Sequence, residues 1–94
     1  MKVIVEFGGG LETVFENKRI IEVELPGEKA TVSQLIECLK DKYVKGKMDY
    51  FYEKGLRAGI LVLINDADWS LSGEGDSELE NKDKVSFIST LHGG

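Results

Sequence analysis

The sequence ends in two glycines, Gly93 and Gly94, directly after a strand-like segment. A terminal carboxylate without neighbouring side chains can enter a narrow channel, where the catalytic groups of another protein can activate it. Glycines are also common in frayed chain ends, so the pair by itself leaves both interpretations open. His92, beside the pair, can serve as a base or as a docking contact. We favour the docking contact, because the sequence places no nucleophile near it.

The other reactive side chains form no recognisable catalytic or metal motif. Cys38 and His92 are the one cysteine and the one histidine, too few for an internal disulfide or a tetrahedral zinc site. Gly8–Gly10 lacks the lysine and the hydroxyl residue of a phosphate-binding loop, so a hairpin turn is favoured. Asp66 and Asp68 do not have the spacing of a calcium loop. We therefore predict a protein that is not an enzyme and holds no metal or cofactor.

Length and charge narrow the class of protein further. The 94 residues predict one domain over residues 1–94, and the net charge of -5 is opposite in sign to what direct binding of nucleic acid requires. All of the net charge lies in residues 48–94, with nine acidic and four basic side chains, either to keep the protein soluble or to attract a basic partner. No apolar run approaches the ~20 residues of a membrane span, and no signal peptide is evident. A monomer in the cytoplasm is expected, with the nucleus as an alternative.

Alternating apolar residues predict strands at both ends of the chain. The segment 2–7 places Val3, Val5 and Phe7 on one side, and segment 20–25 repeats the pattern to form a hairpin. The connection 11–19 is expected to be a loop with a little strand near residues 13–15. In the last strand, 84–90, Val85 and Phe87 are predicted to point inward.

A helix is predicted to begin at Thr31, which with Gln34 fits a capping box. Its apolar sector should cover one face of the sheet and consists of Val32, Leu35, Ile36, Leu39 and Tyr43. Cys38 lies at the border of this sector, where a half-buried thiol is favoured over a nucleophile.

The apolar run 60–64 predicts a strand contacted on both faces. A turn at Asn65-Asp66 and a short strand over 68–70 follow, and the acidic segment 71–83 is expected to be a loop with a helical turn near 77–79. Residues 50–52 are expected to pack as a lid on the sheet edge or on the helix end. The element order predicts the α+β class, with a mixed sheet that wraps one main helix.

Strand parity also predicts a docking surface. Ile4 and Ile88 should point to the open face of the sheet, joined by one parity of the run 60–64, beside Leu91 and His92 at the root of the tail. The alternative is that the lid at 50–52 covers this apolar surface.

Three segments give the chain a specific resemblance. They are Val5-Glu6-Phe7-Gly8-Gly9-Gly10-Leu11, the run from Arg57 to Trp69, and Phe87-Ile88-Ser89-Thr90-Leu91-His92-Gly93-Gly94. In this order they resemble the ubiquitin-related modifier 1 family of eukaryotic ubiquitin-like sulfur carriers, and the resemblance runs from end to end. It implies a β-grasp fold with residues 90–94 as an extended C-terminal tail.

The same resemblance implies a function. An E1-like enzyme with a rhodanese domain would use ATP to adenylate Gly94 and convert it to a thiocarboxylate, with Gly93 also required for activation. A separate thiolase would pass the sulfur to the wobble uridine of certain tRNAs, and the activated terminus would also join lysines of target proteins. Two alternatives remain open: a pure protein modifier, and a plain ubiquitin-fold interaction domain.

Overall fold

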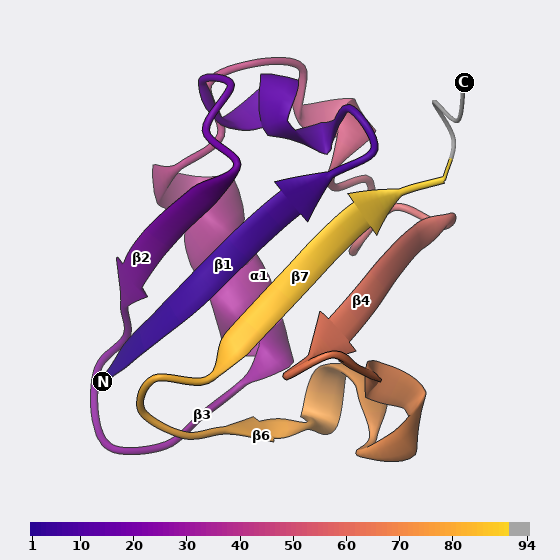
Figure 1. Ribbon diagram of the computed structural model, residues 1–94. Helices are drawn as coiled ribbons and strands as arrows, with labels where there is room; N and C mark the ends of the chain where they lie inside the picture. Colours follow the sequence, from indigo (N-terminus) through magenta and orange to yellow (C-terminus); the bar gives the residue numbers. More distant parts are fainter. Residues whose placement is uncertain (91–94) are drawn as a thin grey trace.

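The structure, a computed structural model, describes residues 1–90. Its main sheet has the strand order β2-β1-β7-β4-β5 (Figure 1). The bounds are Lys2–Gly8 for β1, Ile20–Glu24 for β2, Ile60–Ile64 for β4, Ala67–Asp68 for β5 and Lys84–Ser89 for β7. β1 and β7 are parallel, whereas the other neighbours are antiparallel. The predicted mixed sheet and its opening hairpin are confirmed.

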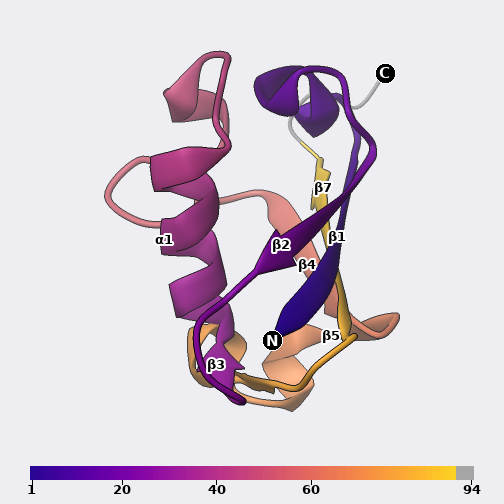
Figure 2. The ribbon, with the colours of Figure 1, turned by 90° about the vertical axis from the view of Figure 1, so that its left-hand side faces the viewer.

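One face of the sheet is covered by helix α1, Val32–Lys42 (Figure 2). Its first turn carries the predicted capping box. The backbone N–H of Gln34 donates to the Thr31 hydroxyl at 3.2 Å, and the backbone N–H of Thr31 donates to the side-chain carbonyl oxygen of Gln34 at 2.7 Å. These two bonds satisfy donors that would otherwise be orphaned at the helix start. Four residues of the predicted sector are buried against the sheet, namely Val32, Leu35, Ile36 and Leu39.

The core lies between α1 and the sheet and is filled at one end by aromatic rings. Phe7 stacks on Phe15 with ring centroids 4.0 Å apart. Phe51 contacts Phe15 and Phe87 edge-on, at 5.1 and 5.7 Å. Such arrangements add to the free energy gained by burying the rings, and they join β1, the segment that ends at Phe15 and the loop at Phe51 to β7.

Two expectations for the first half of the chain are wrong. Residues 11–15 form a 3-10 helix, Leu11–Phe15, instead of a short strand, because Leu11, Val14 and Phe15 turn inward to close the core. Residues 50–52 do not cover the open face of the sheet, the alternative considered above: Phe51 is fully buried on the helix side, and the Tyr52 ring lies 4.9 Å from the Lys40 ammonium of α1. The 3-10 helix Met48–Tyr50 leads into Phe51. The open face of the sheet is therefore not covered by this segment.

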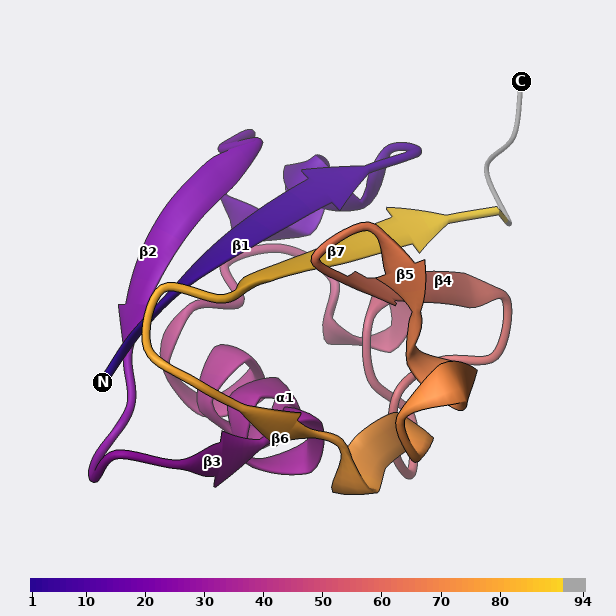
Figure 3. The same ribbon diagram turned by 60° about the horizontal axis from the view of Figure 1, so that its bottom comes forward.

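Further corrections concern the region after α1. Residues 78–79 are strand β6, Glu78–Leu79, which pairs with β3, Ala30–Thr31, and the helical turns lie earlier, at Trp69–Leu71 and Glu74–Asp76 (Figure 3). The short strand after the turn is β5, and it begins one residue earlier than predicted. β4 is not contacted on both faces, since Val62 is buried but Leu61 is 39% exposed on the open face.

Candidate functional site at the exit of β7

The chain leaves the sheet at Ser89 and Thr90, which we call the tail root. Ser89 is buried, and the Thr90 amide donates to the Gly59 carbonyl at 3.0 Å. The Thr90 hydroxyl donates to the same carbonyl. The direction of the chain at Thr90 is thus fixed by the backbone just before β4.

A glycine turn after β1 packs against the tail root from the other side. Gly9 has φ +68, and a Cβ atom built on it would lie 2.0 Å from the Ser89 carbonyl oxygen. This is closer than non-bonded atoms can approach, so no other residue fits without displacing the backbone. Gly8 lies opposite Ile88 in the parallel register, where a Cβ would make ordinary contact at 3.6 Å.

The loop that presents Gly59 is tied to the core. The Arg57 amide donates to the Phe51 carbonyl at 2.8 Å, and its guanidinium donates to the Asp49 carbonyl at 2.7 Å. Gly59 itself has φ +91, in the region that favours glycine. Since Phe51 is buried among the aromatic rings, the position of Gly59 and of the tail root follows from core packing.

The three sequence segments behind the family resemblance therefore meet in space. β1 and β7 are parallel, so their C-terminal ends lie together, and antiparallel β4 begins beside them (Figure 1). Sequence reasoning identified the terminal glycines but not Gly9, Gly59 and Thr90 as the residues that hold the root. Glycine immediately after one strand and before another was the available signal.

The four residues beyond the root, Leu91, His92, Gly93 and Gly94, lie outside the described residues. Their assignment as docking residues, and as the group to be activated, stays a prediction.

The open face of the sheet carries apolar side chains in two separate places. Half-buried Ile88 lies opposite Leu61, beside the tail root. Ile4 lies on the same face, but opposite Lys84 and Glu22. In the register between them, Ser86 on β7 lies opposite Glu6 on β1 and Leu63 on β4, and Ser86 is buried. The face assignment of Ile4 and Ile88 agrees with the register, whereas the predicted joining of the two into one surface does not.

Charged groups on the open face lie at the end opposite the tail root. The Lys84 ammonium is 3.0 Å from the Asp66 carboxylate and 3.9 Å from Glu6. The hydrogen bond that the Lys84 ammonium donates to the Asp66 carboxylate, together with the negative charges of Asp66 and Glu6, raises the pKa of Lys84 above its ordinary value. The tail root itself is left with uncharged neighbours, Gly8, Gly59 and Ile88.

Over residues 1–90, no group of three His, Cys, Asp or Glu side chains is placed to hold a metal ion. Cys38 is half-buried on α1, and in this part of the chain no helix is long and apolar enough to cross a bilayer.

A family model and individual relatives of known sequence indicate the same family for this chain. The model of the Urm1 (Ubiquitin related modifier) family matches residues 2–94. Ubiquitin-related modifier 1 of Homo sapiens is 45% identical over 97 residues, which cover 100% of this chain and 96% of the human protein.

Solved structures agree with this family. The solution structure of Urm1 from Trypanosoma brucei has a TM-score of 0.83 at 36% identity, covering 99% of this chain and 95% of that chain. A chain from the crystal structure of the Amycolatopsis orientalis BexX/CysO complex has a TM-score of 0.71 at 26% identity, covering 98% and 99%. The predicted β-grasp fold is confirmed by these neighbours.

Proposed function

Since the chain belongs to the Urm1 (ubiquitin related modifier) family, we propose that it is a sulfur carrier whose Gly94 carboxylate becomes a thiocarboxylate. The family match, which reaches Gly94, carries the proposal. The anchored tail root supports it, because a fixed exit point allows a partner that holds the body of the domain to receive the terminus in a defined place.

The proposed chemistry takes place on partners. An E1-like enzyme with a rhodanese domain binds ATP and joins AMP to the Gly94 carboxylate with release of pyrophosphate, so AMP becomes a leaving group. Sulfur at the oxidation level of sulfide that displaces AMP gives the thiocarboxylate, and a lysine amine of a target protein that displaces AMP gives an isopeptide bond. This chain supplies the carboxylate and its position and no catalytic group.

The length of the tail is sufficient for the terminus to enter the active site of a partner. Five residues from Thr90 to Gly94 can span at most about 17 Å, which matches the depth of an active-site cleft. The domain body can thus stay outside the cleft that holds the terminus.

A mass measurement tests the proposal. Incubation with the activating enzyme, ATP and a sulfur donor should give protein heavier by one oxygen-to-sulfur exchange. Deletion of Gly94, or replacement of Gly93 by Phe, should leave urea unfolding unchanged and abolish the mass shift. Gly55→Ala is the control for a glycine substitution elsewhere: a Cβ there meets no atom within 4 Å, but φ +123 strains an alanine, so this variant should lose some stability and keep the mass shift. Adenylation of the truncated protein would contradict the proposal; lysine conjugates without any thiocarboxylate would identify a pure modifier, and neither product a plain interaction domain.

We further propose that the sulfur is delivered to tRNA wobble uridines through a separate thiolase. The net charge of -5 disfavours direct contact with phosphates, so the isolated protein should show no salt-sensitive affinity for tRNA. Micromolar tRNA binding that weakens steeply with salt would contradict this. The cytoplasm, with the nucleus as the alternative, is the proposed location.

Docking on the activating enzyme is proposed at the apolar surface beside the tail root, formed by Ile88 with Leu91 and His92, and with Ile4 as a separate contact. Ile88→Asp should weaken binding to the enzyme by about 1–3 kcal/mol without unfolding the domain. Ile20→Asp is the control, since Ile20 is 61% exposed on the distant strand β2. Equal effects of the two substitutions would place docking elsewhere.

A further inference from the structure

Strand β2 is an edge of the main sheet with unused backbone hydrogen-bonding groups. The Leu25 amide donates to the Met1 carbonyl, and the Phe7 amide donates to the Arg19 carbonyl, both at 2.8 Å. Because antiparallel bonding alternates along a strand, the odd-numbered residues of β2 face β1. The backbone groups of Glu22 and Glu24 therefore point away from the sheet, and no hydrogen-bond partner for them occurs among residues 1–90.

Two hollows lie along this free edge, lined by residues of β2, α1 and their flanking loops. Figure 2 shows β2 facing α1. The first, of about 360 Å³, lies at the end of β2 and is lined by Leu25, Pro26, Ala30 and Cys38, among others. The second, of about 350 Å³, lies at the start of β2 and is lined by Phe15, Ile21 and Tyr43, among others. We call the two hollows and the edge between them the β2–α1 groove.

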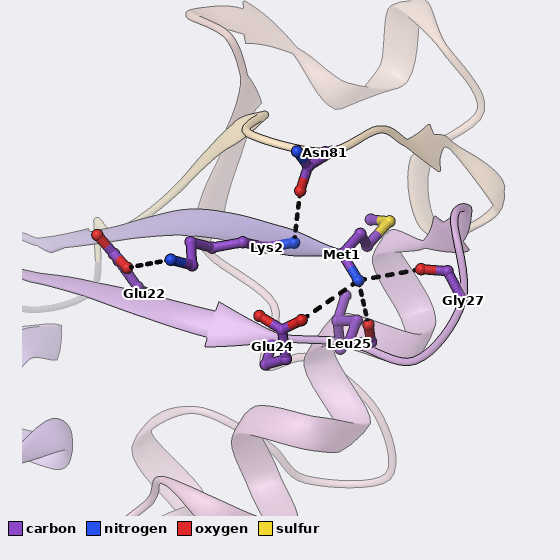
Figure 4. A network of polar contacts seen from close by, with 7 residues as sticks. All are labelled: Met1, Lys2, Glu22, Glu24, Leu25, Gly27 and Asn81. Atoms are coloured by element: carbon purple, nitrogen blue, oxygen red, sulfur yellow. Dashed lines mark hydrogen bonds and ion pairs between the residues drawn. The ribbon is translucent and has the colours of Figure 1, made fainter.

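The side chains that line the β2–α1 groove include more carboxylates than ammonium groups. The carboxylates are those of Glu16, Glu22, Glu24 and Glu37, and the ammonium groups are those of Lys18 and Lys42. Each carboxylate has a cationic partner: Glu22 pairs with Lys2 at 3.2 Å and Glu24 with the Met1 amino group at 3.5 Å (Figure 4), Glu16 with Lys18 at 3.9 Å and Glu37 with Lys40 at 3.2 Å. The four glutamates are at least half exposed, so these ion pairs contribute little and leave the carboxylates accessible to a second cation.

We propose that the β2–α1 groove binds an extended, basic segment of a partner protein, which adds to β2 as a further strand. The free amides and carbonyls of Glu22 and Glu24 would bond its backbone, as in other cases of strand addition to a sheet edge. Ile21 and Leu25 are four positions apart, about 13 Å at ~3.3 Å per residue. Apolar partner side chains four positions apart can therefore occupy the two hollows, and Lys or Arg between them would face Glu22 and Glu24.

This surface is separate from the tail root. β1 lies between β2 and β7 in the sheet, so a segment bound at β2 does not cover the end of β7. A partner held in the groove can thus choose the target while the terminus reacts elsewhere, and the inference does not depend on the proposed sulfur chemistry.

Selection from a phage-displayed library of random twelve-residue peptides tests the proposal. The enriched peptides should alternate apolar residues with Lys or Arg. On binding, they should slow hydrogen exchange at the Glu22 and Glu24 amides, shift the NMR signals of β2 and α1, and protect Cys38, the one cysteine, from alkylation.

Variants separate the contributions. Glu22→Pro removes one outward donor without removing a bond to β1, and should abolish binding. The double charge reversal Glu22→Lys with Glu24→Lys, which keeps the backbone, should lower peptide affinity about tenfold or more. Two substitutions outside the groove should leave peptide binding unchanged. They are Glu80→Lys, a charge reversal at an exposed residue, and Ile88→Asp, beside the tail root.

Three results would overturn the proposal. The first is no enrichment of basic alternating peptides, and the second is binding that maps to the open face around Ile88. The third is a protein that sediments as a dimer with slow Glu22 and Glu24 amide exchange before any peptide is added, since a second copy of this chain would then occupy the edge.

Discussion

Replacement of Gly9 by Ala tests whether the glycine turn holds the tail root. An alanine there must adopt φ +68, which costs about 1–2 kcal/mol for a residue with a Cβ atom. The new Cβ would also lie 2.0 Å from the Ser89 carbonyl oxygen and 3.0 Å from the Ser89 nitrogen, so strand β7 must move. Overpacking of this kind costs a further ~1–3 kcal/mol. The expected total loss in the free energy of unfolding is ~2–5 kcal/mol. Small domains typically have a total free energy of unfolding of about 5–15 kcal/mol, so the variant should be clearly destabilised.

Gly27→Ala is the matched control. Gly27 also has positive φ, at +81, but its Cβ would meet only the Lys29 carbonyl oxygen, at 3.9 Å. It therefore carries the backbone strain without the overlap, and its loss should be ~1–2 kcal/mol. Urea unfolding measures both variants, and hydrogen exchange at the Thr90 amide, which donates to Gly59, reports whether the root has come loose.

The two readouts together can refute the reasoning. If Gly9→Ala costs no more than Gly27→Ala, the close approach to Ser89 does not constrain the fold. If the cost is larger but Thr90 exchange stays slow, the strain is absorbed in the turn and the tail root does not depend on Gly9. Faster Thr90 exchange in Gly9→Ala alone is the expected result, and it should be accompanied by slower activation of the terminus.

Three other substitutions probe the fold and its charges. Phe51→Ala should lower the free energy of unfolding by about 3–5 kcal/mol in urea, because it empties a fully buried site, whereas Phe51→Leu should cost less. Thr31→Ala should cost about 0.5–2 kcal/mol by thermal or urea unfolding, because the capping box is lost. Asp66→Asn should lower the pKa of Lys84 in an NMR titration, because the hydrogen bond that Lys84 donates to the Asp66 carboxylate raises it. Since that pKa is raised by folding, the ion pair stabilises the fold below the ordinary lysine pKa, and its contribution is lost as the pH rises through the folded pKa. Asp66→Asn should reduce this alkaline loss and leave the part that is due to Glu6.

Local rules explain which elements could be predicted from the sequence. The strands near Val3 and Val85 alternate between a buried and an open face, and their period of two is visible in the residues themselves. Helix α1 begins where the side chains of Thr31 and Gln34 accept hydrogen bonds from each other's backbone N–H groups, a pattern that needs only four consecutive residues. The terminal glycines and the family resemblance were also visible directly.

The missed elements depend on contacts between residues far apart in the chain. β6 exists because Leu79 pairs with Ala30, and nothing within residues 77–79 encodes that partner. The mixture of polar and aromatic residues over 45–59 predicts no definite element and only packing on the sheet edge or a helix end, yet contact with Phe15 and Phe87 draws Phe51 into the core. Burial of a large ring outweighs the weak preferences of a short loop.

The candidate site divides in the same way. The sequence, through the family resemblance, predicted Gly93 and Gly94 as the residues required for activation, and strand parity predicted Ile88 as an outward-facing residue near them. Only the tertiary structure showed that Gly9 and Gly59 hold the tail root, and that Ile4 is separated from Ile88. These facts depend on which strands become neighbours and in what register, and register is set by the packing of the whole sheet against α1 rather than by any one segment.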